Sequence, residues 1–105
     1  MNDEFLGLLG IARRASKLSL GHDAAVTSIK KGKAKLCLLS SDASERLEKE
    51  FNYLLENKKI KIIRHDYSMD ELNFAISSRA GVLTVDDDGF AQRISEILLR
   101  RNDLL

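Results

Sequence analysis

The feature that most constrains the fold is a regular alternation of strand-type and helix-type patterns along the chain. The short, mostly apolar runs Leu36–Leu39 and Val82–Val85 have the character of strands buried on both faces, and the first of them suits a central parallel strand. Ile60–Ile63 and a brief extended piece around Lys17–Leu20 complete four predicted strands. Because helical patterns separate all of them, the sequence predicts an α/β fold, a three-layer α/β/α sandwich with a four-stranded mixed sheet.

Capping residues mark the starts of the predicted helices. Ser68-Met69-Asp70-Glu71 has the spacing of a capping box, and Gly32 stands where a helix would end. The pattern predicts helices from Asn2 or Asp3 to near Ala15, at about His22–Lys31, after Ser44, after Ser68 and after Asp86–Asp88.

Length and cysteine content limit the class of protein. The 105 residues indicate one domain spanning residues 1–105, large enough to fold alone. The single cysteine, Cys37, excludes an internal disulfide, and its apolar neighbours suit a reducing, cytoplasmic location. The apolar stretch Phe5–Ala12 is too short to cross a bilayer, and Arg13-Arg14 follows it rather than precedes it. We therefore expect neither export nor a membrane partner.

Positive charge is concentrated in one part of the chain. The net charge is only +1, but the segment from Arg13 to Lys35 holds seven basic residues and one acid, Asp23. Gly21-His22-Asp23 precedes or opens a predicted helix, whose free backbone N–H groups suit phosphate. The alternative is a simple helix cap. Lys30 and Lys31 could serve only to complement the helix dipole, whereas Lys33 and Lys35 add charge that the dipole does not require.

Two other groups allow two interpretations each. Arg79-Ala80-Gly81 could let the backbone approach a partner closely, or could be a simple tight turn. Asp86–Asp88 could attract a hard cation, but carboxylates in a first helical turn are the favoured interpretation, so no metal site is predicted.

The sequence offers no argument for an enzyme. Cys37 lies in a predicted buried strand, where a thiol is a poor nucleophile. His22 and His65 form no recognisable pattern with a nucleophile or carboxylate, and no nucleotide-binding or zinc motif is present. We expect no cofactor.

Four matching stretches reveal a family resemblance: Leu6–Leu20, Gly21, Lys31–Ser44 and Val82–Ala91. The whole chain resembles the kink-turn RNA-binding ribosomal protein superfamily of the L-seven-Ae/L-thirty-e type, and within it the bacterial YlxQ-like branch. The resemblance implies a non-catalytic RNA binder with an α/β/α sandwich, whose contact surface is built from the start of the second helix and nearby loops.

This chain departs from the helix-start motif of the family's kink-turn binders. That motif reads glycine, any residue, asparagine, glutamate, and then lysine three positions later, whereas this chain has Gly21, His22, Asp23, Ala24 and Thr27. Only the glycine is kept. The loop that contacts the extruded base in those relatives corresponds to Ser78–Gly81.

The sequence thus predicts a cytoplasmic, non-catalytic RNA-binding protein of the translation apparatus. Its expected partner is structured RNA, either ribosomal or another noncoding RNA, and the ribosome is the place where such RNA would be met. We expect contacts to phosphate to dominate, and we expect no binding to DNA. The chief alternative is a protein-interaction module that kept the fold and lost RNA affinity, with a small enzyme a more distant one. The predicted RNA-binding residues are Gly21, His22, Asp23, Thr27, Lys31, Lys33, Lys35, Ser41, Asp42, Arg79, Ala80 and Gly81.

Overall fold

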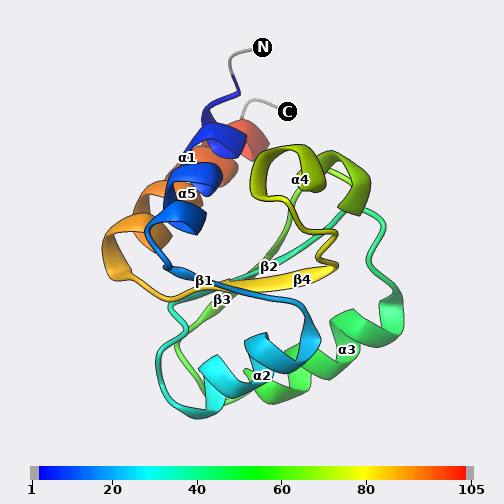
Figure 1. Cartoon of the computed structure of the whole chain (residues 1–105). Coiled ribbons are helices and arrows are strands. Elements are labelled where there is room, and N and C mark those ends of the chain that lie inside the picture. The colour runs from blue at the N-terminus through cyan, green and yellow to red at the C-terminus, as the bar shows by residue number, and fades with distance from the viewer. Residues whose placement is uncertain (1–2, 104–105) are drawn as a thin grey trace.

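Helices and strands alternate along the chain as the sequence predicted. The computed structural model describes residues 3–103, with side chains described for residues 3–100. The elements, labelled in Figure 1, are α1 (Glu4–Arg14), β1 (Leu18–Leu20), α2 (His22–Lys30), β2 (Leu36–Leu39), α3 (Glu45–Leu54), β3 (Lys61–Arg64), α4 (Met69–Ile76), β4 (Val82–Val85) and α5 (Asp88–Asp103).

The four strands form one mixed sheet in the order β1-β4-β2-β3. β2 is parallel to β3 and antiparallel to β4, which is in turn antiparallel to β1. The expectation of a central parallel strand at Leu36–Leu39 is therefore correct for only one of its two neighbours. As a consequence, β1, β2 and β3 all begin at the same edge of the sheet, and β4 ends there.

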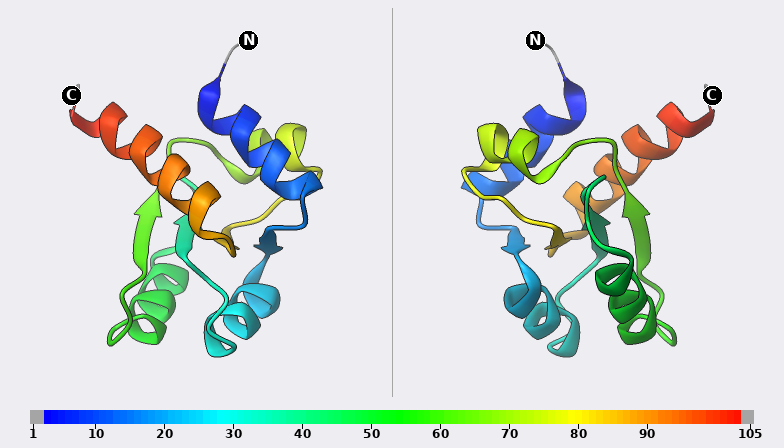
Figure 2. Two further views of the ribbon diagram at one scale, coloured as in Figure 1. Left: turned by 90° about the vertical axis from the view of Figure 1, so that its left-hand side faces the viewer. Right: turned by 90° about the vertical axis from the view of Figure 1, so that its right-hand side faces the viewer.

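Helices cover both faces of the sheet, which confirms the three-layer α/β/α sandwich. α1, α4 and α5 lie on one face, and α2 and α3 lie on the other (Figures 1 and 2). Alternate side chains of β2 point to opposite faces. Leu36 and Leu38 join the core beneath α1, α4 and α5, while Cys37 and Leu39 join the core beneath α2 and α3.

The predicted caps are present in the structure. The side chain of Asp3 accepts the Leu6 N–H at 2.9 Å, and Ser44 Oγ accepts the Leu47 N–H at 3.1 Å. Ser68 and Glu71 form the predicted capping box. Asn2, the other cap considered for the first helix, lies outside the described residues.

Element boundaries differ from the prediction by about one residue. The first two helices end at Arg14 and Lys30, and β3 covers Lys61–Arg64 rather than Ile60–Ile63. Arg64 belongs to the strand because its backbone pairs with Leu39 of β2, and the His65 N–H donates to the Leu39 carbonyl at 2.9 Å. Within the described residues, no helix is both long and apolar enough to cross a membrane.

Candidate nucleic-acid interface

The start of α2 depends on the glycine at its N-cap. Gly21 has φ 89° and ψ 173°, a conformation that a residue with a side chain rarely adopts. Its own N–H donates to the Val82 carbonyl at 2.9 Å, and it provides no side chain to cap the helix. The first backbone N–H groups of α2 therefore remain open to an outside acceptor.

The two side chains that follow Gly21 interact with each other. His22 Nδ1 lies 2.9 Å from the Asp23 carboxylate, and Nε2 lies 2.6 Å from Glu50 of α3. These hydrogen bonds, first to Asp23 and then to Glu50, raise the pKa of His22 above its ordinary value. The edge of the ring meets Phe51, with centroids 5.7 Å apart. Asp23 thus pairs with His22, and the N-cap of the helix is Gly21, which provides no side-chain hydrogen bond.

A groove of about 660 Å³ runs along the exposed side of α2, and we call it the α2 groove. Asp23, Ala24, Thr27 and Ser28 line it from the helix. The remaining lining residues come from β1, from the segments next to β1 and α2, and from the residue after β4: Ser16, Lys17, Leu18, Ser19, Lys31, Lys33 and Asp86.

Asp86 links the strands and the helix that line the α2 groove. Its carboxylate accepts hydrogen bonds from the hydroxyls of Ser19 at 2.5 Å, Ser28 at 2.7 Å and Thr84 at 2.8 Å. One residue after β4 therefore joins β1, α2 and β4. Asp87 accepts the Phe90 N–H at 2.9 Å. The Asp87 contact and the position of Asp88 in the first turn of α5 agree with the helix-start interpretation, whereas Asp86 joins three other elements instead.

The predicted residues Ser41 and Asp42 lie at the opposite edge of the sheet, in the β2–α3 loop. The Arg64 guanidinium donates to the carbonyls of Ser40 and Ala43, both at 2.9 Å, and also contacts Glu48. Asp42 is exposed, and its carboxylate accepts the Met69 N–H at 3.1 Å. Arg64 therefore holds the loop in one conformation, although it was not among the predicted RNA-binding residues.

Arg79, Ala80 and Gly81 lie beside this loop. The Ser40 N–H donates to the Gly81 carbonyl at 3.0 Å, and Ser40 Oγ donates to the Ala80 carbonyl at 2.7 Å. The Ala80 side chain is buried, so a partner cannot touch it directly. Arg79 is exposed and paired with Asp70 at 2.6 Å. The tight-turn interpretation therefore fits Ala80, while Arg79 remains accessible.

The predicted site residues fall at two edges of the sheet. Gly21, Ser41, Asp42 and Arg79–Gly81 lie at the edge where β4 begins, which we call the loop edge. Lys31, Lys33 and Lys35 lie at the edge where β4 ends, since the Lys35 N–H donates to the Val85 carbonyl. The four residues of β4 separate the edges by about 10 Å. The α2 groove extends from Lys31 and Lys33 to Asp23, near the start of α2.

Eight of the nine lysines precede or begin β1, β2 or β3, and we call this side of the sheet the lysine edge. In the described part of the chain, no lysine lies within ion-pair distance of a carboxylate. The predicted RNA-binding residues did not include Lys17 or the α3–β3 lysines, although their places just before or at the start of predicted strands could have indicated them. The lysine edge consists of Lys17, Lys30, Lys31, Lys33, Lys35, Lys58, Lys59 and Lys61.

Comparison with known proteins identifies the family. The family model for the ribosomal protein L7Ae/L30e/S12e/Gadd45 family matches residues 3–95, and the chain belongs to this family. It is 34% identical over 101 residues to the RNA-binding protein YlxQ of Bacillus subtilis, covering 90% of this chain and 95% of that protein. It is 29% identical to the large ribosomal subunit protein eL30 of Eremothecium gossypii, over 77% of this chain and 79% of that one.

Solved structures show the same fold. A protein of unknown function from Bacillus halodurans C superposes with a TM-score of 0.85 at 28% identity, covering 92% of this chain and 98% of that one. The Giardia lamblia 15.5kD RNA binding protein superposes with a TM-score of 0.73 at 19% identity, over 100% of this chain and 93% of that one. The mixed α/β architecture is thus shared with relatives of low sequence identity.

Proposed function

We propose that the protein is a non-catalytic binder of structured RNA that works with the translation apparatus. The proposal is supported by membership of the ribosomal protein family and by two relatives, one named an RNA-binding protein and one a large-subunit ribosomal protein. The RNA is ribosomal or another noncoding RNA, contacted through the start of α2, the α2 groove and the adjacent loops.

The observation that carries this proposal is the set of unpaired cations in the α2 groove. Lys17, Lys31 and Lys33 line the groove, all three are exposed, and none has an ion-pair partner among the described residues. The same groove reaches Asp23, next to the open backbone N–H groups that follow Gly21. Lysines beside a free helix start suit a phosphate backbone better than an apolar ligand.

The loop edge makes a smaller electrostatic contribution. Asp23 is fully exposed, Asp42 is exposed, and Arg79 is already paired with Asp70. Phosphate is therefore held mainly by the lysines, while the loop edge contacts RNA by shape and backbone.

The test is a salt series of binding to structured RNA for the wild type and for Lys17→Ala/Lys31→Ala/Lys33→Ala. Each lysine that contacts a phosphate contributes about 0.7–0.9 to the slope of log affinity against log salt, so the triple variant loses about 2 in slope. Arg46→Ala/Lys49→Ala, which removes two exposed cations of α3, is the control and leaves binding unchanged. A DNA duplex of the same sequence binds more weakly.

A second candidate is a protein-interaction module on the same fold. It is favoured by Phe74 of α4, whose side chain is 90% exposed, and by the net charge of only +1. Unchanged affinity and slope in the groove triple variant contradict the RNA site proposed here. Absence of wild-type binding to any structured RNA at low salt favours the interaction module instead.

A further inference from the structure

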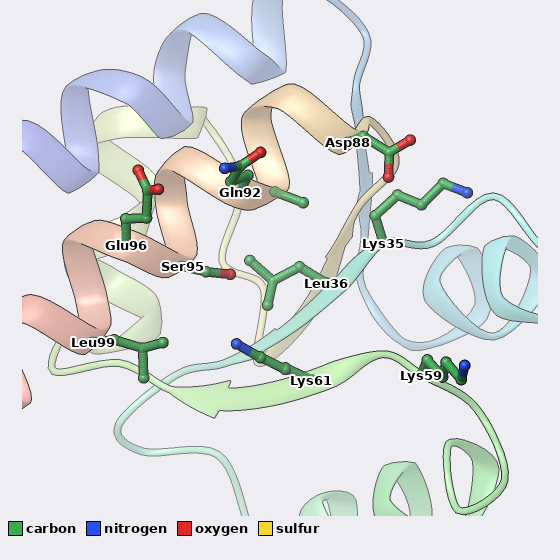
Figure 3. Close-up of a pocket in the computed structure, with 10 residues that line it drawn as sticks. Lys35, Leu36, Lys59, Lys61, Asp88, Gln92, Ser95, Glu96 and Leu99 are labelled. Atoms are coloured by element: carbon green, nitrogen blue, oxygen red, sulfur yellow. The ribbon is translucent and has the colours of Figure 1, made fainter.

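The lysine edge holds a second depression, which lies beside α5 on the face of the sheet opposite α2 (Figure 2). It has a volume of about 510 Å³ and lies between β2, β3 and α5 (Figure 3). Lys35, Lys59 and Lys61 line it together with residues of α5, including Gln92, Ser95 and Leu99. We call it the β3 groove.

A third depression joins the β3 groove to the end of α2. It has a volume of about 470 Å³, shares Lys35, Lys59 and Asp88 with the β3 groove, and adds Lys58 and Gly32. Gly32 follows the last turn of α2, so the hollowed surface continues from the β3 groove toward the helix that borders the α2 groove.

The sheet order places the two grooves at opposite ends of one row of lysines. β1 and β3 are the outer strands, and Leu36 of β2 pairs with Lys61 of β3. Three spacings between neighbouring strands separate β1 from β3 by about 14–15 Å. A chain of phosphates laid across the starts of the strands therefore meets Lys17 first, then Lys33 and Lys35, and finally the lysines at β3.

The lining chemistry favours a phosphate backbone over other ligands. Lys35, Lys58, Lys59 and Lys61 are exposed, and within the described residues none of them is paired with a carboxylate. Asp88 and Glu96 also line the surface, but they leave the lysines in excess. No aromatic side chain lines either depression, which argues against a platform for stacked, single-stranded bases.

We propose that the β3 groove is a second phosphate-binding site, which holds the backbone of a helical RNA stem that extends along the lysine edge from the α2 groove. The inference rests on the proposed function for the identity of the ligand, but it assigns a different surface. A lysine contacts a phosphate as a point charge on a flexible side chain. The contact of these lysines with RNA therefore depends on the position of the phosphate backbone and not on the base sequence.

The test compares two variants that each remove three lysines. Lys58→Ala/Lys59→Ala/Lys61→Ala removes Lys59 and Lys61 from the β3 groove and Lys58 from the adjoining depression. Lys17→Ala/Lys31→Ala/Lys33→Ala removes the lysines that line the α2 groove. The probe is a synthetic RNA hairpin with an uninterrupted stem of about 16 base pairs, the length that a double-stranded RNA-binding domain spans. A hairpin with the same loop and a stem of about four base pairs, too short to span the roughly 14–15 Å between the outer strands, is the matched ligand.

The β3-groove variant is expected to lose roughly tenfold or more in affinity for the long stem and about 2 in salt slope, and to change little on the short stem. The α2-groove variant is expected to weaken binding to both. Because Lys61 lies in β3, the double variant Lys58→Ala/Lys59→Ala, confined to the α3–β3 loop, repeats the measurement without altering the sheet. Arg46→Ala/Lys49→Ala again serves as the charge control.

The outcomes separate the two proposals. If the β3-groove variants bind the long stem as the wild type does while the α2-groove variant fails, the second site is refuted and the proposed function stands. If only the β3-groove variants lose affinity, the second site stands and the α2 groove is the wrong surface. Binding of polyglutamate as tight as that of the stem shows that the β3 groove takes an acidic protein, and overturns the assignment.

Discussion

The pKa values of the two histidines in this chain are shifted in opposite directions by their surroundings. His22 is exposed and lies between Asp23 and Glu50, which raise its pKa. His65 is buried beside Phe5 and Tyr67, and loss of solvation lowers its pKa to about 4. The sequence identified both as isolated histidines without a catalytic partner. It could not distinguish them, because the contact of His22 with Glu50 of α3 and the burial of His65 both arise only in the folded chain.

His65 is expected to make the fold sensitive to acid. Its Nδ1 accepts the Tyr67 N–H at 3.1 Å, and its buried Nε2 has no hydrogen-bond partner among the described residues. Because the folded pKa is about 4 and the unfolded value is about 6.5, the unfolded chain binds the proton more readily between these values. Stability is therefore lost as the pH falls from about 6.5 to about 4, by about 2 kcal/mol.

Urea unfolding at pH 7 and pH 4.5 measures this effect, with His65→Asn as the comparison. Asparagine keeps an acceptor for the Tyr67 N–H but does not titrate, so the variant loses less stability on acidification than the wild type does. An equal loss in both proteins would show that the acid sensitivity does not come from His65.

The start of α2 gives a second prediction at this scale. Asp23, Ala24 and Thr27 are exposed, and all three line the α2 groove. Asp23→Asn/Ala24→Glu/Thr27→Lys removes a repelling charge, adds an acceptor for a guanine edge and adds a cation for phosphate, each worth about 1–3 kcal/mol when the geometry is good. We expect the wild type to bind a standard kink-turn weakly and this variant to bind it more tightly.

Titration against a kink-turn RNA and against the same RNA with the kink removed measures the change. Circular dichroism of the variant checks that α2 is intact. Tight and specific binding of the kink-turn by the wild type would contradict the prediction, because it would mean that the three departures from the family motif have no effect.

At the scale of elements, local signals predicted most of the fold. Ser44 and Ser68 cap the helices expected of them, and Leu36–Leu39 and Val82–Val85 are strands at the predicted positions. Strand direction was predicted less well, because a run of apolar residues buried on both faces does not record which neighbours are parallel. Cys37 is fully buried as expected, and burial raises the pKa of its thiol to about 12.

The apolar pattern could not indicate that β3 ends at the charged residue Arg64. A terminal arginine was excluded from the predicted strand, yet Arg64 pairs with Leu39 of β2 and completes β3. Its guanidinium also reaches the β2–α3 loop. Arg64→Leu removes bonds to the carbonyls of Ser40, Ser41 and Ala43 and the contact with Glu48, with an expected cost of about 2 kcal/mol.

The affected region should be the loop edge rather than the whole fold. Hydrogen exchange of the amides at residues 41–44 is expected to accelerate in Arg64→Leu, while the control Arg46→Ala leaves both exchange and the free energy of unfolding unchanged. Arg64→Lys should not restore protection, because lysine lacks the planar fork that spans the carbonyls and the carboxylate. Unchanged loop exchange in Arg64→Leu would refute the role of Arg64 in fixing the loop.

At the scale of the whole molecule, the candidate site was only partly predictable. Lys31, Lys33 and Lys35 are close to Gly21 in sequence, but α2 and β4 place them at the opposite edge of the sheet. Lys58, Lys59 and Lys61 are far from Gly32 in sequence, yet Lys58 and Lys59 line the same depression as Gly32. Convergence of these segments follows from the shared direction of β1, β2 and β3, which local patterns do not encode.

The position of β3 at the end of the sheet has a further consequence. An outer strand presents unpaired backbone groups, and a second polypeptide can add to them as an extra strand. In β3 the isoleucines Ile62 and Ile63 lie between Lys61 and Arg64, and like charges at both ends repel an identical strand. The lysine that we assign to RNA contact therefore also protects the chain from self-association, and a neutral, β-branched residue in its place would favour aggregation.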